Sequence, residues 1–128
     1  MPALQQKVAK AMNAKDFRRE LIKAMPGYAW TVRRSSVVHR LEATGSQSSG
    51  SNRTSTLNVI RTDRDGKVTY MVRSSGYGLS APWLAQAEDG TLLRALRNLQ
   101  DHYECQANDY RAHADALALG RVVAELSA

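Results

Sequence analysis

The sequence predicts an α+β domain: an amino-terminal helical segment, an antiparallel sheet of three or four strands, and a long carboxyl-terminal helix packed on one sheet face. Two periodicities predict it. Between Thr91 and Leu119, apolar residues recur every three, four or seven positions, which is typical of one face of a long helix. Over much of 28–74, apolar and polar residues alternate as in half-buried strands. A chain of 128 residues suits a single domain, 1–128, in the order α-β-β-β-α.

Residues 3–25 have the period of a helix, but their apolar residues form two faces that do not coincide on one helical wheel. We therefore expect two short helices, or a kink, around residues 13–16, with Asn13 as the amino-terminal cap of the second piece. Pro26 and Gly27 end the segment. The first face consists of Leu4, Val8 and Met12, and the second of Phe17, Leu21 and Ala24.

Residues 28–34 alternate and predict the first strand, with Tyr28, Trp30 and Val32 on its buried face and Arg33 on the other. Residues 37–41 either extend this strand or form a short separate one. Residues 44–56 contain only small and polar side chains and Arg53, so burial cannot offset the entropy of ordering them. We therefore expect a mobile loop over 44–56, inside an antiparallel sheet that spans 28–74.

Residues 57–62 and 67–74 predict a hairpin around an Asp-Gly turn at 63–66. If Thr62 lies opposite Lys67, the alternating apolar residues of both strands fall on one face, and Ile60, Lys67, Met71 and Arg73 fall on the other. The predicted buried face consists of Leu57, Val59, Val68, Tyr70 and Val72.

Residues 74–84 form a glycine-punctuated loop that carries Tyr77 and Trp83. These aromatic side chains either pack on the core or stack on a ligand. We expect residues 85–90 to be a linker, Asp89 or Thr91 to cap the long helix over 91–119, and Gly120 to end or kink it.

No catalytic constellation is recognisable in the sequence, so we do not expect an enzyme or a bound cofactor. Cys105 lies within the long helix beside Glu104, where nothing activates its thiol. Asp109 and His113 are one helical turn apart, but two ligands do not make a metal site, so we expect none. No apolar run is long enough to cross a membrane, and the polar amino terminus is unlike a signal peptide, so we expect a cytoplasmic protein.

The charge balance points to a polyanionic partner, since 18 Lys and Arg residues stand against 12 Asp and Glu residues, a formal net charge of +6. We expect basic side chains on the outer face of the sheet and in its flanking loops to contact nucleic acid, helped by an aromatic residue. The candidate nucleic-acid-binding residues are Arg33, Arg34, Arg53, Lys67, Arg73, Tyr77, Trp83, Arg94 and Arg97.

The order helix, three strands, helix resembles the topology of the double-stranded-RNA-binding domain, from about Phe17 to Tyr103. That family carries a basic cluster at the start of its last helix after a glycine-containing turn, and here Arg94 and Arg97 lie in the first helical turns. The lysine pair of the family is absent, residues 79–90 intervene, and leucines replace its alanine-rich packing face. We therefore do not assign the chain to that family.

The leading hypothesis is a small, non-enzymatic, intracellular nucleic-acid-binding protein. The alternative is a protein-binding module, an inhibitor or adaptor such as mobile elements encode, that binds an acidic protein through the same basic face. This module could also act by pairing the long helix in a homodimer, because the residues beyond Tyr103 have no evident partner in a small sheet.

Overall fold

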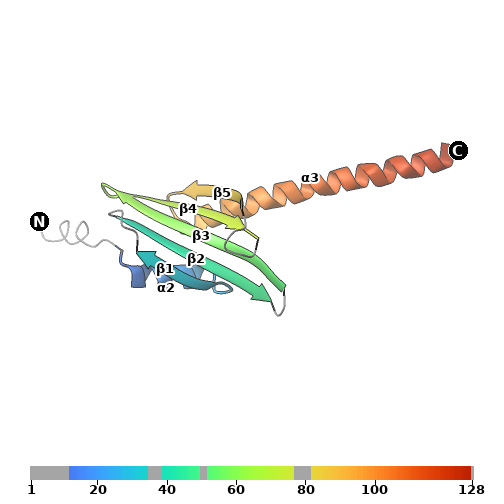
Figure 1. Ribbon diagram of the computed structural model, residues 1–128. Coiled ribbons are helices and arrows are strands. Elements are labelled where there is room, and N and C mark those ends of the chain that lie inside the picture. Colours follow the sequence, from blue (N-terminus) through green and yellow to red (C-terminus); the bar gives the residue numbers. More distant parts are fainter. Residues whose placement is uncertain (1–11, 35–38, 50–51, 77–81, 128) are drawn as a thin grey trace, which may run out of the picture.

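The computed structural model describes residues 12–34, 39–49, 52–76 and 82–127. A helix α2 (Ala14–Ala24) precedes five strands, and a helix α3 (Leu92–Ser127) follows them. The strands form one antiparallel sheet in chain order (Figure 1). They are β1 (Ala29–Arg34), β2 (Arg40–Ser49), β3 (Asn52–Arg64), β4 (Lys67–Ser75) and β5 (Trp83–Asp89). The predicted α+β class is confirmed, with five strands where three or four were expected, so the sheet also departs from that of the double-stranded-RNA-binding domain.

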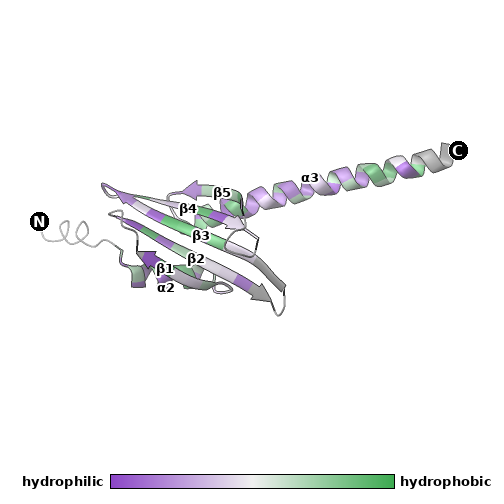
Figure 2. Cartoon of the chain, in the orientation of Figure 1, coloured by the Kyte–Doolittle hydropathy of each residue, from purple (hydrophilic) through white to green (hydrophobic). Residues whose placement is uncertain are grey.

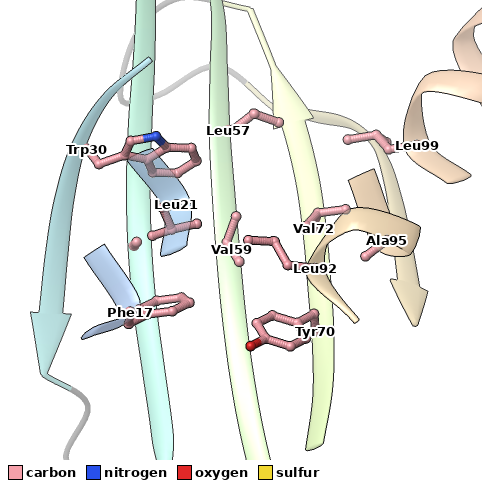
Figure 3. Close-up of a cluster of buried hydrophobic side chains, with 11 residues drawn as sticks. Phe17, Leu21, Trp30, Leu57, Val59, Tyr70, Val72, Leu92, Ala95 and Leu99 are labelled. Carbon is pink, nitrogen blue, oxygen red and sulfur yellow. The ribbon is translucent and has the colours of Figure 1, made fainter. Parts of the chain in front are cut away.

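Both helices pack on the same face of the sheet, which we call the helix-covered face. Phe17 and Leu21 of α2 and Leu92 and Leu99 of α3 are buried against the strands (Figure 3). The buried strand residues of this core include Trp30, Ala43, Leu57, Val59, Tyr70 and Val72. No helix of the described residues packs on the opposite face, which we call the open face.

The structure confirms the helix predicted around Phe17 and Leu21, which begins after Asn13. The side chain of Asn13 accepts a hydrogen bond from the backbone N–H of Asp16 at 2.8 Å, as expected of an amino-terminal cap. The helix ends at Ala24, two residues before Pro26. The part of the predicted helical segment 3–25 that covers residues 3–11 lies outside the described residues.

The β3–β4 hairpin has the predicted buried face but a tighter turn than expected. Asp65 and Gly66 both have positive φ, +54° and +83°, as a two-residue turn of mirror-image type requires. Thr62 therefore lies opposite Thr69, and Arg64 lies opposite Lys67. The register differs from the expected one by two residues, and a shift of two leaves every side chain on its predicted face.

The prediction of a mobile loop over residues 44–56 is wrong, because β2 and β3 form a long hairpin through this stretch. Thr44 lies opposite Asn58 and Ser46 lies opposite Thr56. Small side chains suit this hairpin because Trp30 packs across Gly45, where a Cβ atom would lie 2.8 Å from the indole ring. Close packing of the aromatic ring, together with the backbone ladder, orders a segment that composition alone assigns to a loop.

The prediction of a linker over residues 85–90 is also wrong, since Trp83–Asp89 form the edge strand β5. Its inward-facing residues Ala85 and Ala87 are small, which gives the strand a weak sequence signal. The long helix is confirmed and is longer than the predicted 91–119. Thr91 caps it by accepting a hydrogen bond from the N–H of Arg94 at 3.2 Å, and the helix passes Gly120 without ending.

Candidate functional site

The open face of the sheet gathers positive charge. The strand registers place Arg33, Arg40, Arg64, Lys67 and Arg73 on this face, with Glu42 and Glu88 as the carboxylates of its described strand residues. Glu42 lies directly opposite Arg33 and accepts a hydrogen bond from Asn58 at 2.9 Å. The charge of Arg33 is therefore partly offset, and the excess lies further along β2, β3 and β4.

Three of these cations surround a hollow of about 540 Å³ at one end of the open face. Arg40, Arg64 and Lys67 line it, and Glu88 is the carboxylate among the lining residues. Thr62 and Thr69 also line the hollow, and the full lining is Arg40, Ile60, Thr62, Arg64, Lys67, Thr69, Met71 and Glu88. This arrangement of hydrogen-bond donors suits an oxyanion such as phosphate.

The guanidinium of Arg40 carries an unsatisfied donor. Its Nε atom is buried and, among the groups that the structure describes, has no hydrogen-bond partner. Buried donors are rarely left unpaired in folded proteins because the loss of hydration is not compensated. An oxyanion in the hollow would offset the charge of this guanidinium, although the buried Nε atom itself is not accessible to it.

A second cation, Arg73, lies over an aromatic ring. Its Nε donates to Asn58 Oδ1 at 3.0 Å, and its guanidinium carbon lies 4.4 Å from the centre of the Trp83 ring. Asn58 is 2% exposed and also donates to the Ala43 carbonyl oxygen at 3.3 Å, so the base of this cluster is rigid. Trp83 is 42% exposed and presents an aromatic surface to solvent beside a fixed positive charge.

The predicted site residues divide between the two faces of the sheet. Arg33, Lys67, Arg73 and Trp83 share the open face, as expected for the sheet residues. Arg94 and Arg97 do not join them, because they line a groove on the helix-covered face. Arg34 lies in β1 and Arg53 in β3, but their side chains are outside the described part of the structure, as is the whole of Tyr77.

Arg40 and Arg64 are the candidate residues that the sequence interpretation missed. The sequence pattern places Arg64 in a four-residue turn and Arg40 in a strand of undefined extent. The signal that could have found Arg64 is the Asp-Gly pair. If Asp65 and Gly66 alone form the turn, β3 extends to Arg64, and Arg64 lies opposite Lys67.

Other functional features are few in the described part of the chain. No three His, Cys, Asp or Glu side chains of the described residues lie close enough to hold a metal ion. No described helix is long and apolar enough to cross a membrane. Comparisons with protein-family models, curated proteins and solved structures find no match for this chain. The open face itself is therefore the basis for a functional proposal.

Proposed function

We propose that this is a non-enzymatic nucleic-acid-binding protein that holds a strand on the open face of its sheet. The observation that carries the proposal is the charge of that face, where five cationic side chains stand against two carboxylates among the described strand residues. Arginine predominates among them, and its planar guanidinium can donate two hydrogen bonds to one phosphate group.

The hollow at the end of β3 and β4 supports phosphate binding in particular. Arg40, Arg64 and Lys67 supply positive charge from three strands, and the hydroxyls of Thr62 and Thr69 supply uncharged donors. A phosphate there would balance the local excess of positive charge around Arg40, Arg64 and Lys67. The contact would release counterions and make binding sensitive to salt.

The Arg73–Trp83 pair supports a single strand over a duplex. A nucleobase can stack on an exposed aromatic or guanidinium plane only when it is unpaired and splayed out. Trp83 lies opposite Ser75, eight residues or about 26 Å along β4 from Lys67, and Arg73 lies two residues along β4 from Met71, which lines the hollow. Backbone and base contacts are thus supported at neighbouring places on one continuous sheet surface.

The test is the binding of a fluorescent oligothymidine of about 12 nucleotides, followed by anisotropy over a range of salt concentrations. The double variant Arg64→Ala/Lys67→Ala should bind more weakly than the wild type. Because each lost phosphate contact to a single strand contributes about 0.7 to the log–log salt slope, the slope should become shallower by about 1.4. The matched control is Arg18→Ala/Lys23→Ala, which removes the same two residue types from exposed positions on α2.

Two outcomes would contradict the proposal. The first is no affinity of the wild type at about 50 mM salt, where non-specific electrostatic binding is strong. The second is an α2 control that weakens binding as much as the open-face variant does, because the effect would then follow from net charge alone. Either result would favour the alternative hypothesis, in which the basic face binds an acidic protein.

A further inference from the structure

A groove on the helix-covered face lies between the end of α2 and the start of α3, and it has a volume of about 890 Å³. Leu57 and Ser74 line it from the sheet, Met25 and Tyr28 from the side of α2, and Leu96 and Tyr103 from α3. Tyr103 also makes a hydrogen bond with Ser74, which fixes the proximal part of α3 on the sheet. The groove is thus a preformed, mostly apolar channel that runs alongside the helix.

The face of α3 that lines this groove continues beyond the sheet, where no other described part of the chain covers it. Every described side chain from Glu104 to Val122 is exposed. Tyr110 and Leu117 are 72% and 76% exposed and follow Leu96 and Tyr103 at intervals of seven residues. Figure 2 shows apolar residues on α3 far from the sheet. An exposed apolar stripe of this kind is typical of a protein interface.

We propose that two copies of the chain pair through α3 in antiparallel orientation, with the distal part of each helix in the groove of the other copy. An antiparallel pairing centred next to Ala107 sets Leu96 opposite Leu117 and Tyr103 opposite Tyr110. The groove is lined by α3 from Leu93 to Ala107, about 21 Å, and in this register it lies opposite residues 106–120 of the other copy.

Charge and sterics both favour the antiparallel orientation. Glu104 and Arg111 flank the apolar stripe on the same side, one helical heptad apart. Antiparallel pairing brings Glu104 of each copy within reach of Arg111 of the other, and two-fold symmetry makes this contact twice. A parallel pairing would put Glu104 of one copy and Arg111 of the other on opposite sides of the seam and a helical heptad apart along it, and it would bring a second sheet to the place where the first sheet already packs on α3.

The first experiment measures the molar mass of the full chain by light scattering after gel filtration. The wild type should have twice the 14.1 kDa of a single chain. Leu117→Glu should raise the dissociation constant of the dimer about a hundredfold or more, because each of two symmetric sites loses a buried leucine. The control is Leu119→Glu, which changes a 66% exposed leucine about 200° further round the same helix and should leave the mass unchanged.

A wild type that remains monomeric at high micromolar concentration would overturn the proposal. Equal dissociation by Leu117→Glu and Leu119→Glu would also overturn it, because the stripe would then not be the contact. Both side chains are exposed in the single chain, so neither variant should unfold it, and circular dichroism can verify the helix content.

Cysteine cross-linking tests the orientation in a Cys105→Ser background, since Cys105 is the cysteine of the natural chain and is exposed. Gln100 and Ala114 are exposed and face each other across the antiparallel pair. The variant carrying both Gln100→Cys and Ala114→Cys should form disulfide-linked dimers, and neither single variant should do so. A disulfide formed by Ala114→Cys alone would indicate parallel helices and contradict the proposed arrangement.

Discussion

Trp30 packs against the backbone of Gly45, and this contact explains why a glycine stands in the middle of β2. The indole is 6% exposed and its Nε1 donates to the carbonyl oxygen of Met25 at 3.1 Å. The ring is therefore fixed from two sides, by the end of α2 and by the sheet. A methyl group at residue 45 would lie 2.8 Å from ring carbons that have little room to move.

Gly45→Ala should destabilise the protein by about 1–3 kcal/mol, the range expected for overpacking a filled site. Urea unfolding followed by circular dichroism measures the change. Gly120→Ala is the control, since nothing lies within 4 Å of the added Cβ and α3 is helical there. That substitution should stabilise the protein by about 0.5–1 kcal/mol. Equal effects of the two substitutions would disagree with the packing of Trp30 on Gly45.

At the scale of the elements, Tyr70 ties α2 to the sheet. Its hydroxyl donates to Glu20 Oε1 of α2 at 2.7 Å and accepts from Arg61 Nε of β3 at 3.1 Å. Burial is the main cause that raises the pKa of Tyr70 to about 12 from the usual 10.0, and the hydrogen bond to Glu20 adds to it. The protonated phenol is therefore the form that the folded state prefers.

Tyr70→Phe should lower the stability at pH 8 by about 1–3 kcal/mol through the loss of hydrogen bonds to charged groups. The pH dependence follows from the raised pKa of Tyr70. Its contribution is complete below pH 10 and is lost as the pH rises from 10 to about 12, because the unfolded chain releases this proton more easily. The stability difference between wild type and variant should therefore shrink between pH 8 and pH 11 in urea titrations. A constant difference would contradict the proposed role of the phenol.

The sequence predicted the elements with strong periodicity and missed those without it. The helix with Phe17 and Leu21, the face of the β3–β4 hairpin and the long helix all follow from apolar spacing. The segment 44–56 has no apolar pattern. At Gly45 the core position is filled by the indole of Trp30 from β1, so this part of β2 needs no apolar side chain of its own. The edge strand β5 presents only Ala85 and Ala87 to the core, so its alternation is hard to distinguish from a linker.

For the whole molecule, the position of the charge depends on tertiary structure that no local pattern predicts. Lys67 and Arg73 were predicted on the outer face because the hairpin alternates, and they lie there. The start of α3 was expected near the same surface, but α3 packs on the opposite side of the sheet and carries Arg94 and Arg97 with it. Arg40 and Arg64 take their place, since the strand registers bring them beside Lys67.

The two proposed surfaces lie on opposite faces of the sheet. Nucleic acid would occupy the open face, and a second copy would occupy the groove of the helix-covered face and the distal part of α3. A dimer would therefore present two open faces, and the two proposals can fail separately. Leu117→Glu should leave the salt slope of oligonucleotide binding per chain unchanged, and Arg64→Ala/Lys67→Ala should leave the molar mass unchanged.

The most direct test of the proposed nucleic-acid interface is a nuclear magnetic resonance titration of the isotope-labelled protein with a short oligothymidine. The chain has two indole N–H groups, one on buried Trp30 and one on half-exposed Trp83. Binding on the open face should shift the Trp83 indole signal and the amides around Arg64 and Lys67, with the Trp30 indole signal unmoved. Shifts confined to α3 around Arg94 and Arg97, or no shifts at about 50 mM salt, would contradict the account.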